Sequence, residues 1–221
     1  MRKFFNRLHF LLSGILLVIM VFSLTACSST RTLEPAPEGY SFIEPPSEEQ
    51  IYGRLESSSM HMTNNPEQIA NWYCDVIVVG KFLGNTDTFM LDSDIPMIYT
   101  RGLFEVTDVL KGNYDEEYIE AAYYGGIISI AEYIDSLSPV QLKNYGLDQI
   151  SESNCDNLYI EERESENSAE PEPAVSYILL LAKSDDGYYT IQSGALGMLP
   201  MQDGKAYDYA TNSYKTFSFM E

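Results

Sequence analysis

Beyond residue 74 the chain is divided into short runs of β-branched and aromatic residues, each bounded by residues that favour turns. Runs of this length, without a helical repeat, are typical of β-strands. Most connections between the runs are short, which favours antiparallel pairing. The sequence therefore predicts a mainly β fold. The predicted strands span residues 75–82, 98–110, 117–124, 176–182, 188–191, 195–198 and 206–209.

The longest predicted strand contains a break in its alternation. Phe104 and Val106 alternate with polar neighbours, whereas Val109 and Leu110 are adjacent and both apolar. Because successive side chains of a strand point to opposite faces, this slip predicts a bulge or a sharp coil near residue 110.

Two short helices are predicted beside the strands. Asn65-Pro66-Glu67 supplies an N-cap, a proline at the first helical position and an acid in the first turn. Ser138-Pro139 begins a second helix, and Gly146 is well placed to end it. A long strand with a bulge, and a helix inserted after the third strand, fit a small antiparallel barrel of the oligonucleotide/oligosaccharide-binding (OB) type. A β-sandwich is the alternative.

Composition divides the rest of the chain. Residues 27–65 contain Pro-rich, Ser-rich and acidic stretches with few apolar residues, so we expect a disordered tether. The barrel domain is predicted over residues 66–210. Within it, residues 147–175 hold nine acids and one base, Arg163, which predicts a mobile acidic insertion. Residues 211–221 are interpreted as a C-terminal tail.

The N-terminus has the pattern of an export signal. The first seven residues contain three cations and no acid, and an apolar run over residues 8–24 follows. The run ends in Leu24-Thr25-Ala26-Cys27, which resembles the lipobox of bacterial lipoproteins, where the cysteine is acylated and becomes the first mature residue. The resemblance implies a signal peptide over 1–26, lipid such as palmitate on Cys27, and a location at the extracytoplasmic face of the cell membrane. An uncleaved transmembrane anchor is the alternative, because the run is nearly long enough to span a bilayer.

Acidic residues dominate the mature chain. Removal of residues 1–26 leaves 10 Lys and Arg against 33 Asp and Glu, a formal charge of −23. This balance argues against nucleic acid as a partner and against peripheral binding to anionic lipid, because both need a cationic surface. The expected partners are the membrane, through the N-terminal lipid, and an unknown extracellular protein, peptide or glycan.

Histidine limits the chemistry that the chain can perform. His9 lies in the signal peptide, so the mature chain retains one histidine, His61, in the tether. Catalytic triads, Cys–His dyads and zinc sites need ligands or bases that this composition does not supply. Phosphate-binding, dinucleotide-binding and serine-nucleophile motifs do not occur in the sequence. We expect a protein that is not an enzyme and has no cofactor and no metal centre.

Two weaker site predictions remain. Cys74 and Cys155 form an even pair in an oxidising compartment and could form a disulfide, although Cys155 lies in an acidic stretch without regular pattern. Asp87, Asp92 and Asp94 crowd one predicted hairpin and could bind Ca²⁺ through their carboxylates, but they lack the spacing of an EF-hand loop.

The order of four segments resembles an uncharacterised extracellular domain common in Gram-positive bacteria. These segments are Val78-Val79-Gly80, Val109-Leu110-Lys111-Gly112, Tyr177-Ile178-Leu179-Leu180-Leu181 and Gly194-Ala195-Leu196-Gly197. That family is similar to the OB-like barrel of the tissue inhibitors of metalloproteinases. The resemblance covers about residues 70–210 and implies a fold but no activity. Those inhibitors act through a free N-terminal cysteine amine that chelates zinc, whereas Cys27 resembles an acylated residue, so inhibition by that route is not implied.

Together these features predict a membrane-anchored, non-enzymatic binding or interaction domain. The expected contact surface is the exposed face of the first strands, together with a glycine-rich hairpin at residues 194–197. The frequent tyrosines suit recognition, because each combines a rigid ring with a polar tip. The alternatives are a Ca²⁺- or cation-responsive module that uses the acidic hairpin, and an envelope protease inhibitor that acts through a loop.

Overall fold

The computed structural model of this chain describes residues 34–57, 63–91, 96–155, 157–164, 170–184 and 186–221. The predicted signal peptide, Cys27, Asp92 and Asp94 lie outside these ranges. Within the described part of the chain, no helix is both long enough and apolar enough to cross a membrane.

The predicted mainly β fold is confirmed. The strands are β1 (Ile51–Ser57), β2 (Val76–Met90), β3 (Ile98–Lys111), β4 (Tyr118–Tyr124), β5 (Gly126–Ser129), β6 (Tyr159–Glu164), β7 (Ser176–Lys183), β8 (Tyr189–Ile191), β9 (Met198–Gln202), β10 (Lys205–Asp208) and β11 (Ser213–Lys215). The α-helices are α2 (Pro66–Trp72), α3 (Ile130–Asp135), α4 (Pro139–Tyr145) and α5 (Glu152–Cys155). Short 3₁₀ helices are η1 (Glu48–Gln50), η2 (Leu147–Gln149), η3 (Gly194–Gly197) and η4 (Ser218–Met220).

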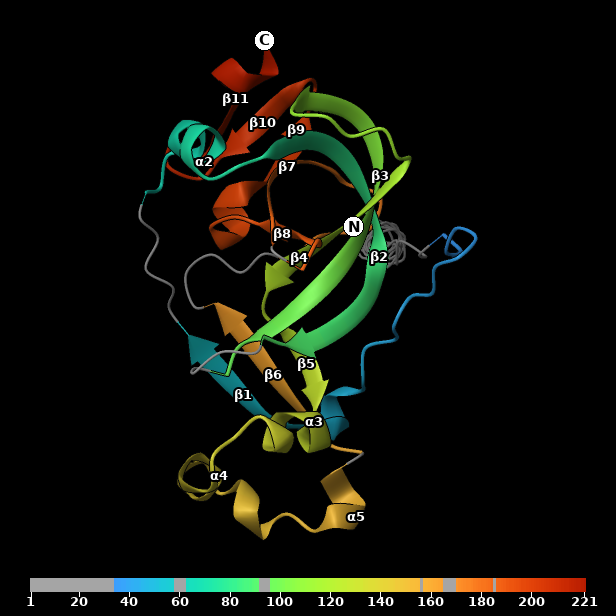
Figure 1. Cartoon of the computed structure of the whole chain (residues 1–221), viewed down its shortest axis with the longest axis vertical. Helices are drawn as coiled ribbons and strands as arrows, with labels where there is room; N and C mark the ends of the chain where they lie inside the picture. Colours follow the sequence, from blue (N-terminus) through green and yellow to red (C-terminus); the bar gives the residue numbers. More distant parts are fainter. Residues whose placement is uncertain (1–33, 58–62, 92–95, 156, 165–169, 185) are drawn as a thin grey trace, which may run out of the picture. The chain divides into compact units, whose positions relative to one another are not determined.

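Five of the strands close into a ring. Each pairs with the next in the order β2, β3, β4, β8 and β7, and β7 pairs back onto β2. All of these pairings are antiparallel except that of β4 with β8, which is parallel. Closure makes this unit a small barrel, as the OB-like prediction requires, rather than a sandwich of two open sheets. Strands β9, β10 and β11 continue the sheet outward from β7 (Figure 1).

The interior of the ring is filled by alternate residues of its strands. Val76, Val78 and Phe82 of β2 belong to one buried cluster with Phe104 of β3. Gly80 continues this inward series, and a Cβ at that position would lie 3.0 Å from the Cβ of Phe104. A larger residue at position 80 would therefore crowd Phe104 on the neighbouring strand β3.

The predicted bulge is confirmed in the pairing of β2 with β3. Ile77 pairs with Lys111, whereas Val78 pairs with Val109, so Leu110 is the extra residue. An extra residue in one strand increases its local bend. The bulge thus helps the long β2–β3 pair to curve around the ring, as Figure 1 shows.

Both predicted helices are confirmed at their N-terminal caps. The Asn65 side chain accepts from the Glu67 backbone N–H at 3.0 Å, at the start of α2. Ser138 and Gln141 form a reciprocal capping box at the start of α4, and Gly146 ends that helix with a φ of 70°. The prediction of a strand at residues 195–198 is wrong: residues 194–197 form η3, and β9 begins at Met198.

The predicted C-terminal tail, residues 211–221, is corrected because it forms β11 and η4. Phe217 is 1% exposed and belongs to a second buried cluster with Ile69 and Cys74 of the α2 region. The backbone N–H of Ser218 donates to Glu67 Oε1 at 2.8 Å. The segment therefore packs with α2 over the outer face of β2, β7 and β9, where an apolar side chain stabilises it by burial.

The predicted disordered tether, residues 27–65, is corrected over its described part. Phe42 lies over Gly84, the Ile43 N–H donates to Asn85 O at 2.8 Å, and the rings of Tyr40 and Tyr118 are 6.0 Å apart. Further on, β1 pairs in parallel with β6. Residues 34–57 are thus held against the barrel unit by contacts that a composition argument does not foresee.

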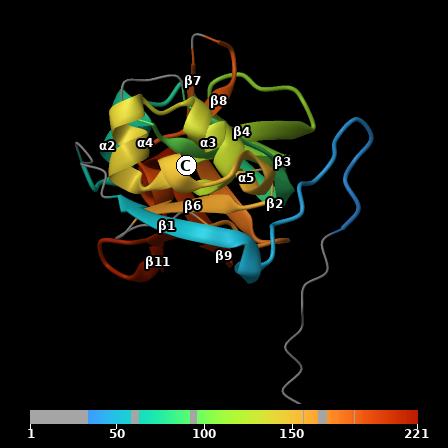
Figure 2. The same ribbon diagram turned by 90° about the horizontal axis from the view of Figure 1, so that it is seen from below.

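The predicted mobile insertion, residues 147–175, is corrected for the same reason. Its strand β6 lies between β1 and β5 in a separate three-stranded sheet. Ile160 of β6 belongs to a third buried cluster with Ile128, Ile130 and Tyr133. Helices α3, α4 and α5 lie beside this sheet at one end of the unit (Figures 1 and 2).

Candidate ligand-binding groove

A groove of about 950 Å³ opens on the outer face of the barrel. One wall is the end of the β2–β3 hairpin, with Phe89 and Arg101. The floor and a second wall come from β4 and the β3–β4 loop, with Glu120 and Tyr114. The third wall is the β7–β8 hairpin, with Tyr188. Segments that are about 100 residues apart in sequence therefore enclose one concave surface, because the ring closes between β4, β8 and β7.

The first wall exists because β2 is longer than predicted. Asn85 and Asp87 were expected in a polar turn, but they belong to β2, which continues to Met90 in antiparallel pairing with β3. Asp87 is opposite Arg101, and Phe89 is opposite Tyr99. Directly opposed residues on one sheet face lie close enough for their side chains to interact. The hairpin thus presents a charged pair and a ring pair side by side.

Arg101 joins the first wall to the third. Its Nη1 donates to Asp87 Oδ2 at 3.2 Å. Its guanidinium carbon lies 4.5 Å from the centre of the Phe89 ring and 5.7 Å from that of Tyr188. A guanidinium over aromatic faces is attracted to them electrostatically. Its Nε is buried and has no hydrogen-bond partner among the described residues, so the aromatic rings and Asp87 are what hold this side chain.

Ring contacts link the walls at two further points. The centres of Phe89 and Tyr188 are 6.0 Å apart, and those of Tyr114 and Tyr189 are 5.8 Å apart, both in edge-to-face geometry. The Tyr114 hydroxyl donates to Tyr118 O at 2.6 Å. Burial, and then the charge of Glu116, raise the pKa of Tyr114 above its usual value. The Tyr114 phenol is therefore neutral at physiological pH.

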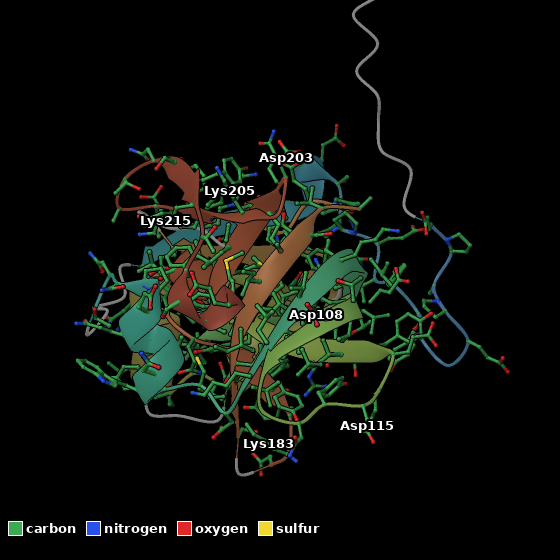
Figure 3. The ribbon with its side chains drawn as sticks, turned by 90° about the horizontal axis from the view of Figure 1, so that it is seen from above. Asp108, Asp115, Lys183, Asp203, Lys205 and Lys215 are labelled. Carbon is green, nitrogen blue, oxygen red and sulfur yellow. The ribbon has the colours of Figure 1, made fainter. Side chains whose placement is uncertain are left out.

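The charged side chains of the groove are mainly acidic. Asp115, Glu116, Glu120 and Asp186 are exposed carboxylates, and they come from the β3–β4 loop, β4 and the β7–β8 hairpin. Glu120 Oε1 accepts from the Thr86 hydroxyl at 2.5 Å. Lys183 faces the same space, and Figure 3 shows it at the same edge of the molecule as Asp115.

The buried Glu162 anchors the loop end of the β2–β3 hairpin. Glu162 of β6 is 6% exposed, and its carboxylate accepts from the Ile98 N–H at 2.7 Å and from the Tyr124 hydroxyl at 2.5 Å. Tyr124 also hydrogen-bonds Ser57 of β1. Because Ile98 is the first residue of β3, this network fixes the start of the strand that carries Arg101. Buried carboxylates are tolerated when hydrogen bonds satisfy them.

The predicted cation site lies only partly within the described residues. Asp87 is paired with Arg101, while Asp92 and Asp94 lie outside the described residues. Among the described residues, no group of three or more His, Cys, Asp or Glu side chains is placed to hold a metal ion. The segment 194–197 is not an exposed hairpin, because Ala195, Leu196 and Gly197 are buried in η3.

The predicted disulfide is absent from the described part of the chain, where Cys74 and Cys155 are both free thiols. Cys74 belongs to the second buried cluster, beside α2, whereas Cys155 packs against the third cluster, in the helical insertion. The two thiols therefore lie in different parts of the fold.

Sequence reasoning missed Phe89, Arg101 and Tyr188 as members of one site. One usable signal was present: Arg101 is the only charged residue in a strand segment that is mainly apolar or aromatic, Ile98-Tyr99-Thr100-Arg101-Gly102-Leu103-Phe104. Charged residues within such a strand need a partner, and that need points to a functional or paired position.

The fold and the groove define a class: a small closed β-barrel with a concave, aromatic and acidic surface beside its hairpin ends. No protein-family model, no curated protein and no solved structure matches this chain.

Proposed function

We propose that this chain is a lipid-anchored extracytoplasmic protein whose barrel binds an extracellular ligand in the groove, without chemical conversion of that ligand. The anchor is supported by Leu24-Thr25-Ala26-Cys27 and the apolar run before it. Several acyl chains hold a protein on a membrane firmly, whereas one chain does so only marginally. The domain would then face the outside of the cell, within reach of proteins, peptides and glycans.

The observation that carries the binding proposal is the position of the groove. In OB barrels, ligands bind over the second and third strands, between the loop that joins strands one and two and the loop that joins strands four and five. Here the ring strands in chain order are β2, β3, β4, β7 and β8, so the equivalent surface lies between the β2–β3 and β7–β8 hairpins. The groove occupies that surface.

Capture from a cell-envelope fraction tests this proposal. Full-length protein in detergent should enrich one saturable ligand, and Tyr188→Ala should weaken its binding by about thirtyfold, since exposed rings at interface centres commonly carry about 2 kcal/mol. Tyr214→Ala is the matched control, because Tyr214 is a 39% exposed tyrosine on β11, outside the groove lining. Equal capture by both variants would place the binding surface elsewhere.

A further inference from the structure

The groove combines aromatic walls with uncompensated negative charge, and we propose that it binds an extended peptide segment that carries lysine or arginine side chains. This inference rests on the proposed function and names the class of ligand for the same groove. Nucleic acids, common ligands of OB barrels, would be repelled by such a surface.

The distribution of charge in the groove favours a cationic ligand. Exposed carboxylates approach the groove from three separate elements, with Asp115 in the β3–β4 loop, Glu120 on β4 and Asp186 in the β7–β8 hairpin. A single run of acids is usually only a solvated surface. Carboxylates that converge from three elements on one concave surface can instead contact one ligand at several points.

Only two of the described groove-lining residues, Arg101 and Lys183, are cations, against four carboxylates. Arg101 is held by Asp87 and two rings, and Lys183 Nζ lies 5.9 Å from the centre of the Tyr189 ring. Lys205 and Lys215 lie on the side of the molecule opposite to Lys183 and Asp115 in Figure 3. The groove carboxylates therefore have too few neighbouring cations to be neutralised from within the described chain.

The aromatic rings of the groove also suit such a ligand. Lysine and arginine carry an apolar stem and a cationic head, so the stem can pack along a ring while the head reaches a carboxylate. Tyr114, Tyr188 and Tyr189 supply such rings in the walls beside the carboxylates. A cation over a ring face gains further attraction. The whole mature chain adds long-range steering, since its formal charge of −23 attracts cationic ligands at low ionic strength.

The direct experiment measures binding of defined probes to the full-length protein in detergent. The probes are a fluorescent decapeptide of alternating lysine and serine, its glutamate counterpart, and a neutral N-acetylglucosamine tetramer. Glu120→Gln combined with Asp186→Asn removes two groove charges and keeps the Glu120 oxygen that accepts from Thr86. Glu56→Gln combined with Asp203→Asn is the matched control, because both of these exposed carboxylates lie outside the groove lining.

We expect the lysine peptide to bind and the glutamate peptide not to bind. The groove double variant should weaken lysine-peptide binding about tenfold at about 50 mM salt, and by much less at about 0.5 M salt, where the Debye length is shorter. The control double variant should bind as the wild type does. Tyr188→Ala should weaken binding at both salt concentrations, because ring contacts are not screened.

Two results would overturn the proposed ligand class. One is equal binding of the lysine peptide to the groove variant and to the control variant. The other is failure of the lysine peptide, whatever the oligosaccharide does. If the oligosaccharide then binds and Tyr188→Ala abolishes that binding, the groove remains a ligand site for a glycan, so the proposed function survives while this inference does not.

Discussion

The cysteine side chains occupy sharply different environments. Cys74 is 7% exposed and lies in a cluster of aliphatic side chains, where its Sγ donates to Ile69 O at 3.4 Å. Burial raises the pKa of the Cys74 thiol to about 12, an effect that the charge of Lys111 only partly offsets. Because the thiolate is the reactive form, this thiol should be inert in the native protein.

We therefore predict that iodoacetamide at about pH 8 alkylates Cys155, which is only half-buried, much faster than Cys74 in the native protein. Both should react once the chain is unfolded, and peptide mass spectrometry measures the two sites. The native state keeps the Cys74 proton more tightly than the unfolded chain, so this contribution to stability is full below the usual thiol pKa of 9.0 and declines as the pH rises toward 12. Comparable rates at the two sites in native protein would contradict the burial of Cys74.

The predicted membrane anchor depends on the thiol of Cys27. Replacement of this thiol by the serine hydroxyl in Cys27→Ser should abolish incorporation of labelled palmitate and move the protein out of the membrane fraction. Cys155→Ser is the matched control and should leave both properties unchanged. Retention of unlabelled Cys27→Ser protein in the membrane would instead favour the uncleaved transmembrane anchor.

At the scale of elements, local pattern and long-range pairing differ in how well sequence foresees them. The strands with neighbours close in sequence, such as β2 with β3, were predicted from runs of β-branched and aromatic residues, and the Val109-Leu110 slip located their bulge. The pairing of β1 with β6 joins residues more than 100 positions apart. Only the alternation of Ile51, Gly53 and Leu55 with exposed residues could have indicated β1, and the preceding prolines obscured it.

The many charged residues of strand β6 prevented its prediction from the sequence. Tyr159-Ile160-Glu161-Glu162-Arg163-Glu164 has the composition of a solvated segment, yet Glu161 and Glu162 are buried. Glu161 pairs with Arg54 Nε at 2.6 Å and with Arg163, while Glu162 bonds Ile98 and Tyr124. Repulsion between neighbouring carboxylates opposes packing, but the ion-pair and hydrogen-bond partners that distant strands supply outweigh this repulsion.

The C-terminal segment gives a prediction at the same scale. Phe217 is 1% exposed and stacks on Phe219 at 5.2 Å between ring centres. Phe217→Ala should lower the free energy of unfolding by about 3–5 kcal/mol, because it removes buried apolar area and leaves a cavity. Chemical denaturation of the full-length protein measures this, and Tyr214→Ala, at an exposed position on β11, should have a much smaller effect. A change no larger than that of the control would mean that the segment does not pack as described.

The molecule as a whole positions the groove through closure of its ring. Phe89 and Arg101 lie on one hairpin, and Tyr188 lies on another that follows the helical insertion. These residues meet because β8 pairs in parallel with β4 and antiparallel with β7. The sequence predicted most of the strands and the barrel, but the groove depends on register and on the length of β2, which the polar composition of residues 85–88 concealed.

The central claim is that the surface between the β2–β3 and β7–β8 hairpins contacts a ligand in the cell envelope. A photo-crosslinking amino acid in place of Tyr188, with the same replacement at Tyr214 as the control, tests this claim in intact cells. We predict a discrete adduct from position 188 that depends on illumination, and none from position 214. Adducts of equal yield from both positions, or from position 214 alone, would contradict the assignment of the groove as the ligand site.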